Sequence, residues 1–180
     1  MVDFMQIVKG RRAIRRFQAK DIPEDDLNTI LEAVKWAPSW ANTQCWEVIV
    51  VKDPSIKGKL EDTLSQGNPA RKATLEAPIV FVLCGRLEHS GYKKGEARTK
   101  FGDWFMFDIG IATQNLCLTA HTLNMGTVIV GLLDQDKAGE ILGVPDGYTV
   151  VALIPMGYPA QEVEAPVRRE ISEFVHYDRF

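Results

Sequence analysis

The sequence feature that most constrains the fold is an apolar stretch over residues 104–123. It approaches the length of a membrane-spanning helix, but it contains polar side chains, among them Asp108 and His121. A membrane span does not carry such a polar load, which is typical of a helix that other elements of a globular protein cover. We therefore predict a buried core helix over residues 103–124, with Gly126 near its C-terminal cap.

The rest of the chain alternates helical and strand patterns. Acidic residues follow Pro23, and apolar residues then repeat at helical spacing until Pro38, which predicts a helix between these prolines. Apolar runs rich in β-branched residues predict strands, and shorter periodic runs predict short helices. The predicted strands cover residues 46–51, 77–84, 127–133 and 149–156, and the short helices cover about 57–65 and 135–142.

Two segments have no regular pattern. Residues 86–98 are polar and contain two glycines, so we expect a mobile excursion or lid. The tail over 157–180 is irregular but carries Phe174, Tyr177 and Phe180, which form an apolar strip with no partner in their own segment. We expect this strip to pack on a second copy of the chain. Length and pattern together predict one α+β domain over residues 1–180, a sandwich around a single sheet.

Composition argues against several classes of protein. The net charge of −3 gives no overall attraction to nucleic acid or to anionic membranes. Three widely spaced cysteines without a C-x-x-C pair predict reduced thiols, not a disulfide framework or a zinc site. Residues 1–16 lack the apolar core of a signal peptide. We expect a cytoplasmic protein that binds neither nucleic acid nor membrane.

The sequence also lacks the short motifs of several enzyme classes. It contains no G-x-G-x-x-G, Walker A, G-x-S-x-G or H-E-x-x-H segment, and its three histidines are not at metal-ligand spacing. No nucleophile, metal site or acid–base pair stands out. If the protein is an enzyme, a bound organic cofactor is expected to carry the chemistry.

A group of arginines near the N-terminus is the first candidate binding segment. Residues 11–17 read R-R-A-I-R-R-F, so four cations occupy six positions. Guanidinium groups donate paired hydrogen bonds in a fixed geometry that suits phosphate. A solvated basic face, or a weak nucleic-acid patch, is the alternative. Ile14 and Phe17 favour a phosphate site because they would anchor the segment to a core.

A loop between the first helix and the first strand is the second candidate. Residues 37–46 read A-P-S-W-A-N-T-Q-C-W and are dense in amide and hydroxyl groups between two tryptophans. Such a loop could hydrogen-bond the edge of a flat heteroaromatic ring and stack on its face. A capped turn whose Ser39 and Asn42 bond to their own backbone explains the pattern equally well.

Two weaker candidates lie in the C-terminal half. Val130 and Gly131 end an apolar run, and a glycine there lets backbone N–H groups approach a ligand. Arg168 and Arg169 could complete a phosphate clamp that begins at Arg11. Taken singly, the first pair is more typical of a plain strand end and the second of surface charge.

Five segments follow one another in a specific order and spacing: R-R-A-I-R-R-F, A-P-S-W-A-N-T-Q-C-W, F-D-I-G-I-A-T-Q-N-L-C-L-T-A, M-G-Y-P and R-R-E-I-S-E-F-V-H-Y-D-R-F. In this order they resemble the nitroreductase family from about residue 5 to the C-terminus. The resemblance implies an α+β sandwich with a mixed central sheet flanked by helices. It also implies an intertwined homodimer with one FMN in each of two sites at the dimer interface.

The resemblance assigns cofactor-binding roles by position. Arg11 and Arg12 match residues that hold the FMN phosphate and ribityl chain, and Arg15 matches the cation near the N1/O2 edge of the ring. The remaining matches are a flavin-lining loop often supplied by the partner subunit, a backbone pair near N5 and O4, and a tail arginine at the phosphate. The flavin-lining loop corresponds to Pro38, Ser39, Trp40 and Asn42. The backbone pair corresponds to Val130 and Gly131, and the tail arginine is Arg168.

The chain departs from the family pattern at three positions. Ala13 stands where serine is common, so one hydroxyl contact is missing. Cys45 stands where proline is common, and Trp40 replaces a small residue, which could narrow the substrate face or stack on the flavin. A further flavin contact after the second helix falls on Asn68, Arg71 or Lys72, and the sequence leaves that choice open.

The implied function is an FMN-dependent NAD(P)H oxidoreductase with ping-pong hydride transfer through flavin N5. NADH or NADPH would be the donor, and a nitroaromatic, a quinone or a similar small molecule the acceptor. The flavin carries the chemistry, and Arg15 is the candidate for tuning its potential. Dehalogenation, azoline oxidation or flavin fragmentation on the same fold, and a non-catalytic FMN-binding or electron-transfer module, remain alternatives.

Overall fold

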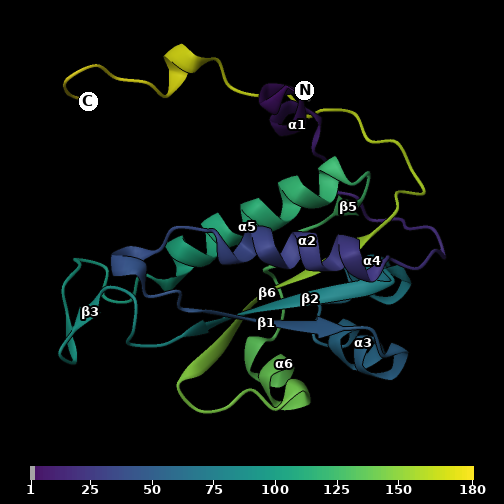
Figure 1. The fold of residues 1–180 in the computed structure, drawn as a ribbon, viewed down its shortest axis with the longest axis horizontal. Helices are drawn as coiled ribbons and strands as arrows, with labels where there is room; N and C mark the ends of the chain where they lie inside the picture. Colours follow the sequence, from purple (N-terminus) through teal and green to yellow (C-terminus); the bar gives the residue numbers. More distant parts are fainter. Residues whose placement is uncertain (1–2) are drawn as a thin grey trace.

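A four-stranded sheet forms the centre of the computed structural model, which describes residues 3–180 (Figure 1). The strand order is β1 (Trp46–Val51), β2 (Ile79–Arg86), β6 (Tyr148–Gly157) and β5 (Gly126–Thr127), and all neighbours are antiparallel. Ala13 adds a parallel bridge to Thr127, which makes the sheet mixed. Central β2 is buried from Ile79 to Gly85 because helices cover both faces of the sheet.

Helices α2 (Glu24–Lys35) and α5 (Phe105–Thr122) pack together on one face of the sheet. The buried face of α2 comes from Leu27, Ile30 and Val34, which recur at helical spacing. Alternate residues of β2, including Phe81, join them in one core cluster. This confirms the buried helix predicted from the apolar stretch, although Asn124, with φ 60°, and not Gly126 is the left-handed residue after its end.

The opposite face of the sheet is covered by α3 (Pro54–Glu61), α4 (Arg71–Glu76) and α6 (Gln135–Leu142). Asp53 and Asp134 cap two of these helices by accepting hydrogen bonds from backbone N–H groups of the first turn. The predicted helix over 135–142 is confirmed. The predicted helix over 57–65 starts earlier, because Asp53 and Pro54 provide an N-cap and a first-turn proline, and it ends earlier, at Glu61.

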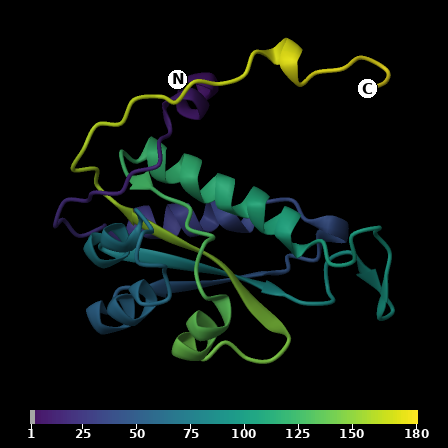
Figure 2. The same cartoon turned by 180° about the vertical axis from the view of Figure 1, so that it is seen from behind.

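Several short elements lie outside the sandwich. Helix α1 (Phe4–Gly10), which the sequence did not predict, precedes the arginine segment. Strands β3 (Tyr92–Lys93) and β4 (Glu96–Ala97) form a small hairpin within the polar excursion. The C-terminal tail leaves the body as an extended arm with one short turn, η2 (Ile171–Glu173) (Figure 2).

One predicted strand is wrong for most of its length. Regular pairing of 127–133 ends at Thr127 and resumes only as an isolated bridge between Val130 and Leu153. Val128 N donates to Pro155 O, and Leu153 N donates to Val130 O, but Pro155 has no N–H to return. The proline therefore interrupts the ladder, and residues 128–133 run as irregular backbone.

Candidate functional site

The arginine segment is an extended strip beside the edge of the sheet. Ile14 N donates to Thr127 O at 2.9 Å, and the Ile14 and Phe17 side chains are buried. Gly126 allows this approach, since a Cβ there would lie 2.6 Å from Ile14 Cβ. The alternation of buried apolar and outward polar side chains confirms that the segment is anchored to the core.

Three arginines of this strip have no acidic partner within residues 3–180. Among residues 3–180, no carboxylate lies within 4.0 Å of a nitrogen of Arg11, Arg12 or Arg15, whereas Arg16 pairs with Glu76. The Nε atoms of Arg12 and Arg15 are buried and have no hydrogen-bond partner within the described chain. Buried cationic donors without acceptors are costly, so the strip is suited to an anionic or carbonyl-rich ligand.

Arg15 lies in a hollow of about 300 Å³ formed with two loops. One loop is the irregular segment after β5, including Val130 and Gly131, and the other contains Asn68. Asn68 Nδ2 donates to Leu132 O at 3.0 Å, which ties the loops together. A Cβ added to Gly131 would meet no atom within 4 Å, so nothing in the described chain itself requires glycine there.

Arg11 and Arg12 lie in a neighbouring hollow, also about 300 Å³, with His121 and the beginning of the tail. Burial lowers the pKa of His121, and the charges of Arg11 and Arg12 lower it further. Sequence reasoning did not single out His121 as a site residue. The sequence feature that could have identified it is a titratable side chain near the end of a mostly apolar helix.

The loop over 37–46 lies at the other end of the sandwich. Trp40 N donates to the carboxylate of Asp108, near the start of α5, whereas His121 is near the end of that helix. At 1.5 Å per residue, Asp108 and His121 are about 20 Å apart along α5. Pro38 and Asn42 line a separate hollow with Trp36, and Ser39 Oγ accepts from Gln44 N. One chain therefore does not bring this loop to its own arginine strip.

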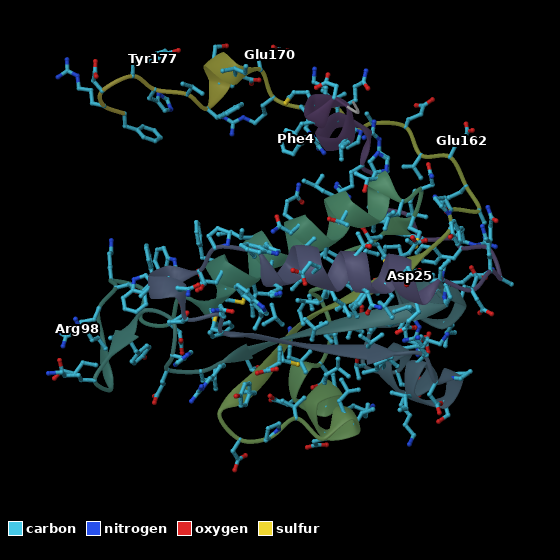
Figure 3. All side chains as sticks on the ribbon, viewed as in Figure 1. Phe4, Asp25, Arg98, Glu162, Glu170 and Tyr177 are labelled. Atoms are coloured by element: carbon cyan, nitrogen blue, oxygen red, sulfur yellow. The ribbon has the colours of Figure 1, made fainter. Side chains whose placement is uncertain are left out.

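Arg168 is exposed on the extended tail and lines neither arginine hollow. Its neighbour Arg169 folds back on the Glu173 carbonyl. Figure 3 shows Tyr177 and Glu170 on the arm that leaves the body of the chain. Glu162, which lines the hollow of Arg11 and Arg12, and Arg98 of the hairpin lie at opposite sides of this view.

The structure distinguishes the three residues that the sequence left open. Arg71 pairs with Glu61 and donates to Leu64 O, and Lys72 pairs with Glu76. Both cations are committed to local structure, whereas Asn68 lines the hollow beside Arg15. The Asn68 side chain is itself bonded to Leu132 O and Ala70 N, so which of the three residues contacts a flavin stays a prediction.

The cysteines offer no activated thiol. Burial, with the nearby Asp108 carboxylate, raises the pKa of Cys45 to about 11, and burial likewise raises the pKa of Cys84 to about 11. Burial also raises the pKa of Cys117. All three thiols are free, buried and protonated at neutral pH, which argues against a nucleophilic role.

Comparison with known proteins identifies the family. The family model described as "Nitroreductase family" matches residues 8–158, most of the chain. The chain belongs to the nitroreductase family. The expected α+β fold class, with a mixed sheet between helical layers, is thereby confirmed together with the resemblance seen in the sequence.

Relatives within the family have different activities in their names. An NADH dehydrogenase of Thermus thermophilus is 32% identical over 178 residues, covering 84% of each chain. An iodotyrosine deiodinase of Haliscomenobacter hydrossis is 25% identical over 185 residues, covering 91% of this chain and 82% of its own. The solved structure of an FMN-dependent nitroreductase from Clostridium difficile superposes with a TM-score of 0.82 at 24% identity, covering 98% and 100% of the two chains. Among the described residues, none of the helices is both long and apolar enough to cross a membrane.

Proposed function

We propose that this nitroreductase-family protein is an FMN-dependent NAD(P)H oxidoreductase of the cytoplasm, with residues 1–180 acting as one cofactor-binding domain. The observation that carries the proposal is the strip of three arginines for which residues 3–180 supply no acidic partner. Two of them have buried Nε atoms without a hydrogen-bond partner in that part of the chain. A phosphate at Arg11 and Arg12 and the electron-rich N1/O2 edge of a flavin at Arg15 would supply the missing acceptors.

The other residues of the two hollows fit the same cofactor. Asn68, Val130 and Gly131 line the hollow around Arg15, where a planar ring would lie, with both backbone groups of Val130 already bonded to Leu153. Ala13 bridges to Thr127 through its backbone and sets the spacing between the phosphate and ring ends of the strip. Bound FMN would supply two-electron hydride transfer from NADH or NADPH to a nitroaromatic, quinone or similar acceptor. The protein's own task is to hold the flavin and to leave one face of its ring open.

We infer further that the working unit is a homodimer. Helix α5 is mostly apolar, yet Met106 and Phe107 on its outer side are 61% and 59% exposed in the single chain. A helix of this kind is normally covered on both sides. The Trp40 loop, which lies at the opposite end of α5 from Arg11 and Arg12, would reach the flavin of the partner, and Arg168 would reach a phosphate through the extended tail.

The test is an absorbance spectrum of the purified protein, followed by anaerobic addition of NADH or NADPH. Flavin bands that bleach on addition are expected, and a screen of nitroaromatics and quinones would then identify the acceptor. Colourless protein that cannot be reconstituted with FMN would refute the proposal. The double variant R11A/R12A should bind FMN poorly but retain more affinity for riboflavin, which lacks the phosphate.

The deiodinase relative favours one second candidate, reductive dehalogenation by the same flavin site. Halogenated phenols as acceptors would distinguish it, because released halide must then account for the NAD(P)H consumed. Flavin that binds tightly but never bleaches with either nucleotide would instead indicate a non-catalytic FMN-binding module.

A further inference from the structure

Asp108 is a buried carboxylate that has no part in the cofactor binding proposed above. It is 1% exposed and lies in the first turn of the 18-residue helix α5. No lysine, arginine or histidine nitrogen within the described part of the chain comes within 4.0 Å of it. The positive end of the helix dipole partly offsets its charge, but a buried carboxylate still requires hydrogen-bond donors.

The donors come from two segments far apart in sequence. Trp40 N donates to both carboxylate oxygens, at 3.1 and 3.2 Å, and the Cys45 thiol donates at 3.5 Å. Ser90 Oγ donates to the same carboxylate at 2.5 Å. Asp108 therefore joins the loop over 39–45 to Ser90, within the excursion over 86–98.

The loop that Asp108 holds has an unfavourable backbone. Ala41, Asn42 and Gln44 have φ of 46°, 56° and 48°, in the left-handed region that non-glycine residues rarely adopt. Within the loop, Asn42 N and Thr43 N donate to Ser39 O and Trp40 O, Gln44 N donates to Ser39 Oγ, and the Gln44 and Asn42 side chains make a long contact. Such a conformation persists only when surrounding contacts hold it. From outside the loop, Asp108 accepts hydrogen bonds from Trp40 N and the Cys45 thiol, and Arg86 N donates to Cys45 O at 2.8 Å.

The base of the excursion is fixed to the same place. Ser90 is fully buried, and its carbonyl accepts from Trp104 N at 2.9 Å. Gly91 has φ of 85°, and a Cβ there would lie 2.6 Å from Gly102 O, so this backbone packs directly on the approach to α5. The two segments can therefore move independently only if a bond to Asp108 and the bond from Arg86 N to Cys45 O both break.

We propose that Asp108 is a positioning residue that sets the Trp40 loop against the excursion, and so sets the acceptor-binding face of the site. This rests on the proposed function, in which the Trp40 loop lines the flavin. Cys45 contributes to the same arrangement as a hydrogen-bond donor, which proline at that position could not be. Trp40 is thereby held at one backbone position, and its indole defines the space left for an acceptor.

The test compares D108N with D103N. Asp103 makes a similar carboxylate bond, accepting from Glu88 N at 2.9 Å, in the same segment but without a bond to the loop. Amide exchange of residues 39–45 is measured by mass spectrometry, and acceptor kinetics are measured on FMN-reconstituted enzyme. In D108N we expect about tenfold faster exchange at the loop and about tenfold higher acceptor KM, with the NADH half-reaction changed much less. D103N should leave both quantities near wild type.

Equal behaviour of D108N and D103N in loop exchange and in KM would overturn the proposal. If D108N does not fold, Ser90→Ala provides the second test, because it removes only the excursion's bond. Loop protection should then persist while acceptor KM rises, and unchanged kinetics would refute the coupling. Failure of all variants and wild type to bind FMN would instead refute the proposed function, whereas the exchange measurement needs no flavin.

Discussion

Replacing Gly126 with alanine tests whether the arginine strip is held as the structure places it. The added methyl would lie 2.6 Å from Ile14 Cβ and still closer to its Cγ1, at a buried backbone contact between β5 and the strip. Overpacking of this kind costs about 2 kcal/mol. Replacing glycine in a strand regains about 0.5 kcal/mol, which leaves a net loss of about 1.5 kcal/mol.

For a chain of 180 residues, that loss corresponds to a Tm lower by about 3 to 6 °C. Displacing Ile14 also displaces its neighbour Arg15, so we expect FMN to bind more weakly in G126A. The assays are differential scanning fluorimetry of the apoprotein and fluorescence titration with FMN. Gly131→Ala is the matched control for stability, because a Cβ there meets no atom within 4 Å. A Tm for G126A equal to that of wild type would refute the placement of Ile14 against β5.

Four further predictions follow from individual groups. Arg15→Ala should lower the flavin midpoint potential by roughly 30 to 60 mV in a spectroelectrochemical titration, and an unchanged potential would dismiss the tuning role. Truncation after Arg169 should lower the Tm in thermal unfolding and the flavin absorbance of the purified protein. It removes apolar side chains that are exposed in the single chain and that we expect to pack on a second copy; an intact holo-dimer would contradict this. The pKa of His121 in the folded protein is lowered below its ordinary 6.5, so the folded state binds the neutral imidazole more favourably than the protonated one. That stability is present above pH 6.5 and is lost as the pH falls through the lower folded pKa; the Tm should fall accordingly, and less in His121→Gln. Cys45 and the two other buried thiols should react with a disulfide reagent at pH 8 only after unfolding, and rapid labelling of the native protein would count against their burial.

Much of the secondary structure was predictable because the hydrophobic pattern is local. The strand at Trp46–Val51 and the helix at Gln135–Leu142 lie where the sequence placed them. The strand beyond Thr127 was not predictable, since its ladder is broken by Pro155 on a neighbouring strand almost thirty residues later. Which strands pair in a sheet depends on the tertiary structure. An apolar run in the sequence therefore cannot reveal whether the strand opposite it has a backbone N–H to donate.

The sequence by itself determined the family, the elements around the core helix and the chemical character of the arginine strip. These properties depend on which residues are present and on their spacing within short segments. Only the tertiary structure decided which groups meet. It placed Asn68, and neither Arg71 nor Lys72, beside Arg15, and it separated the Trp40 loop from that strip by much of the length of α5. It also brought Trp40 N and Ser90 Oγ to Asp108, the lone carboxylate of α5. These two donors lie 68 and 18 residues away from Asp108 in the sequence. Contacts at such separations depend on packing of the whole chain, and no local pattern encodes them.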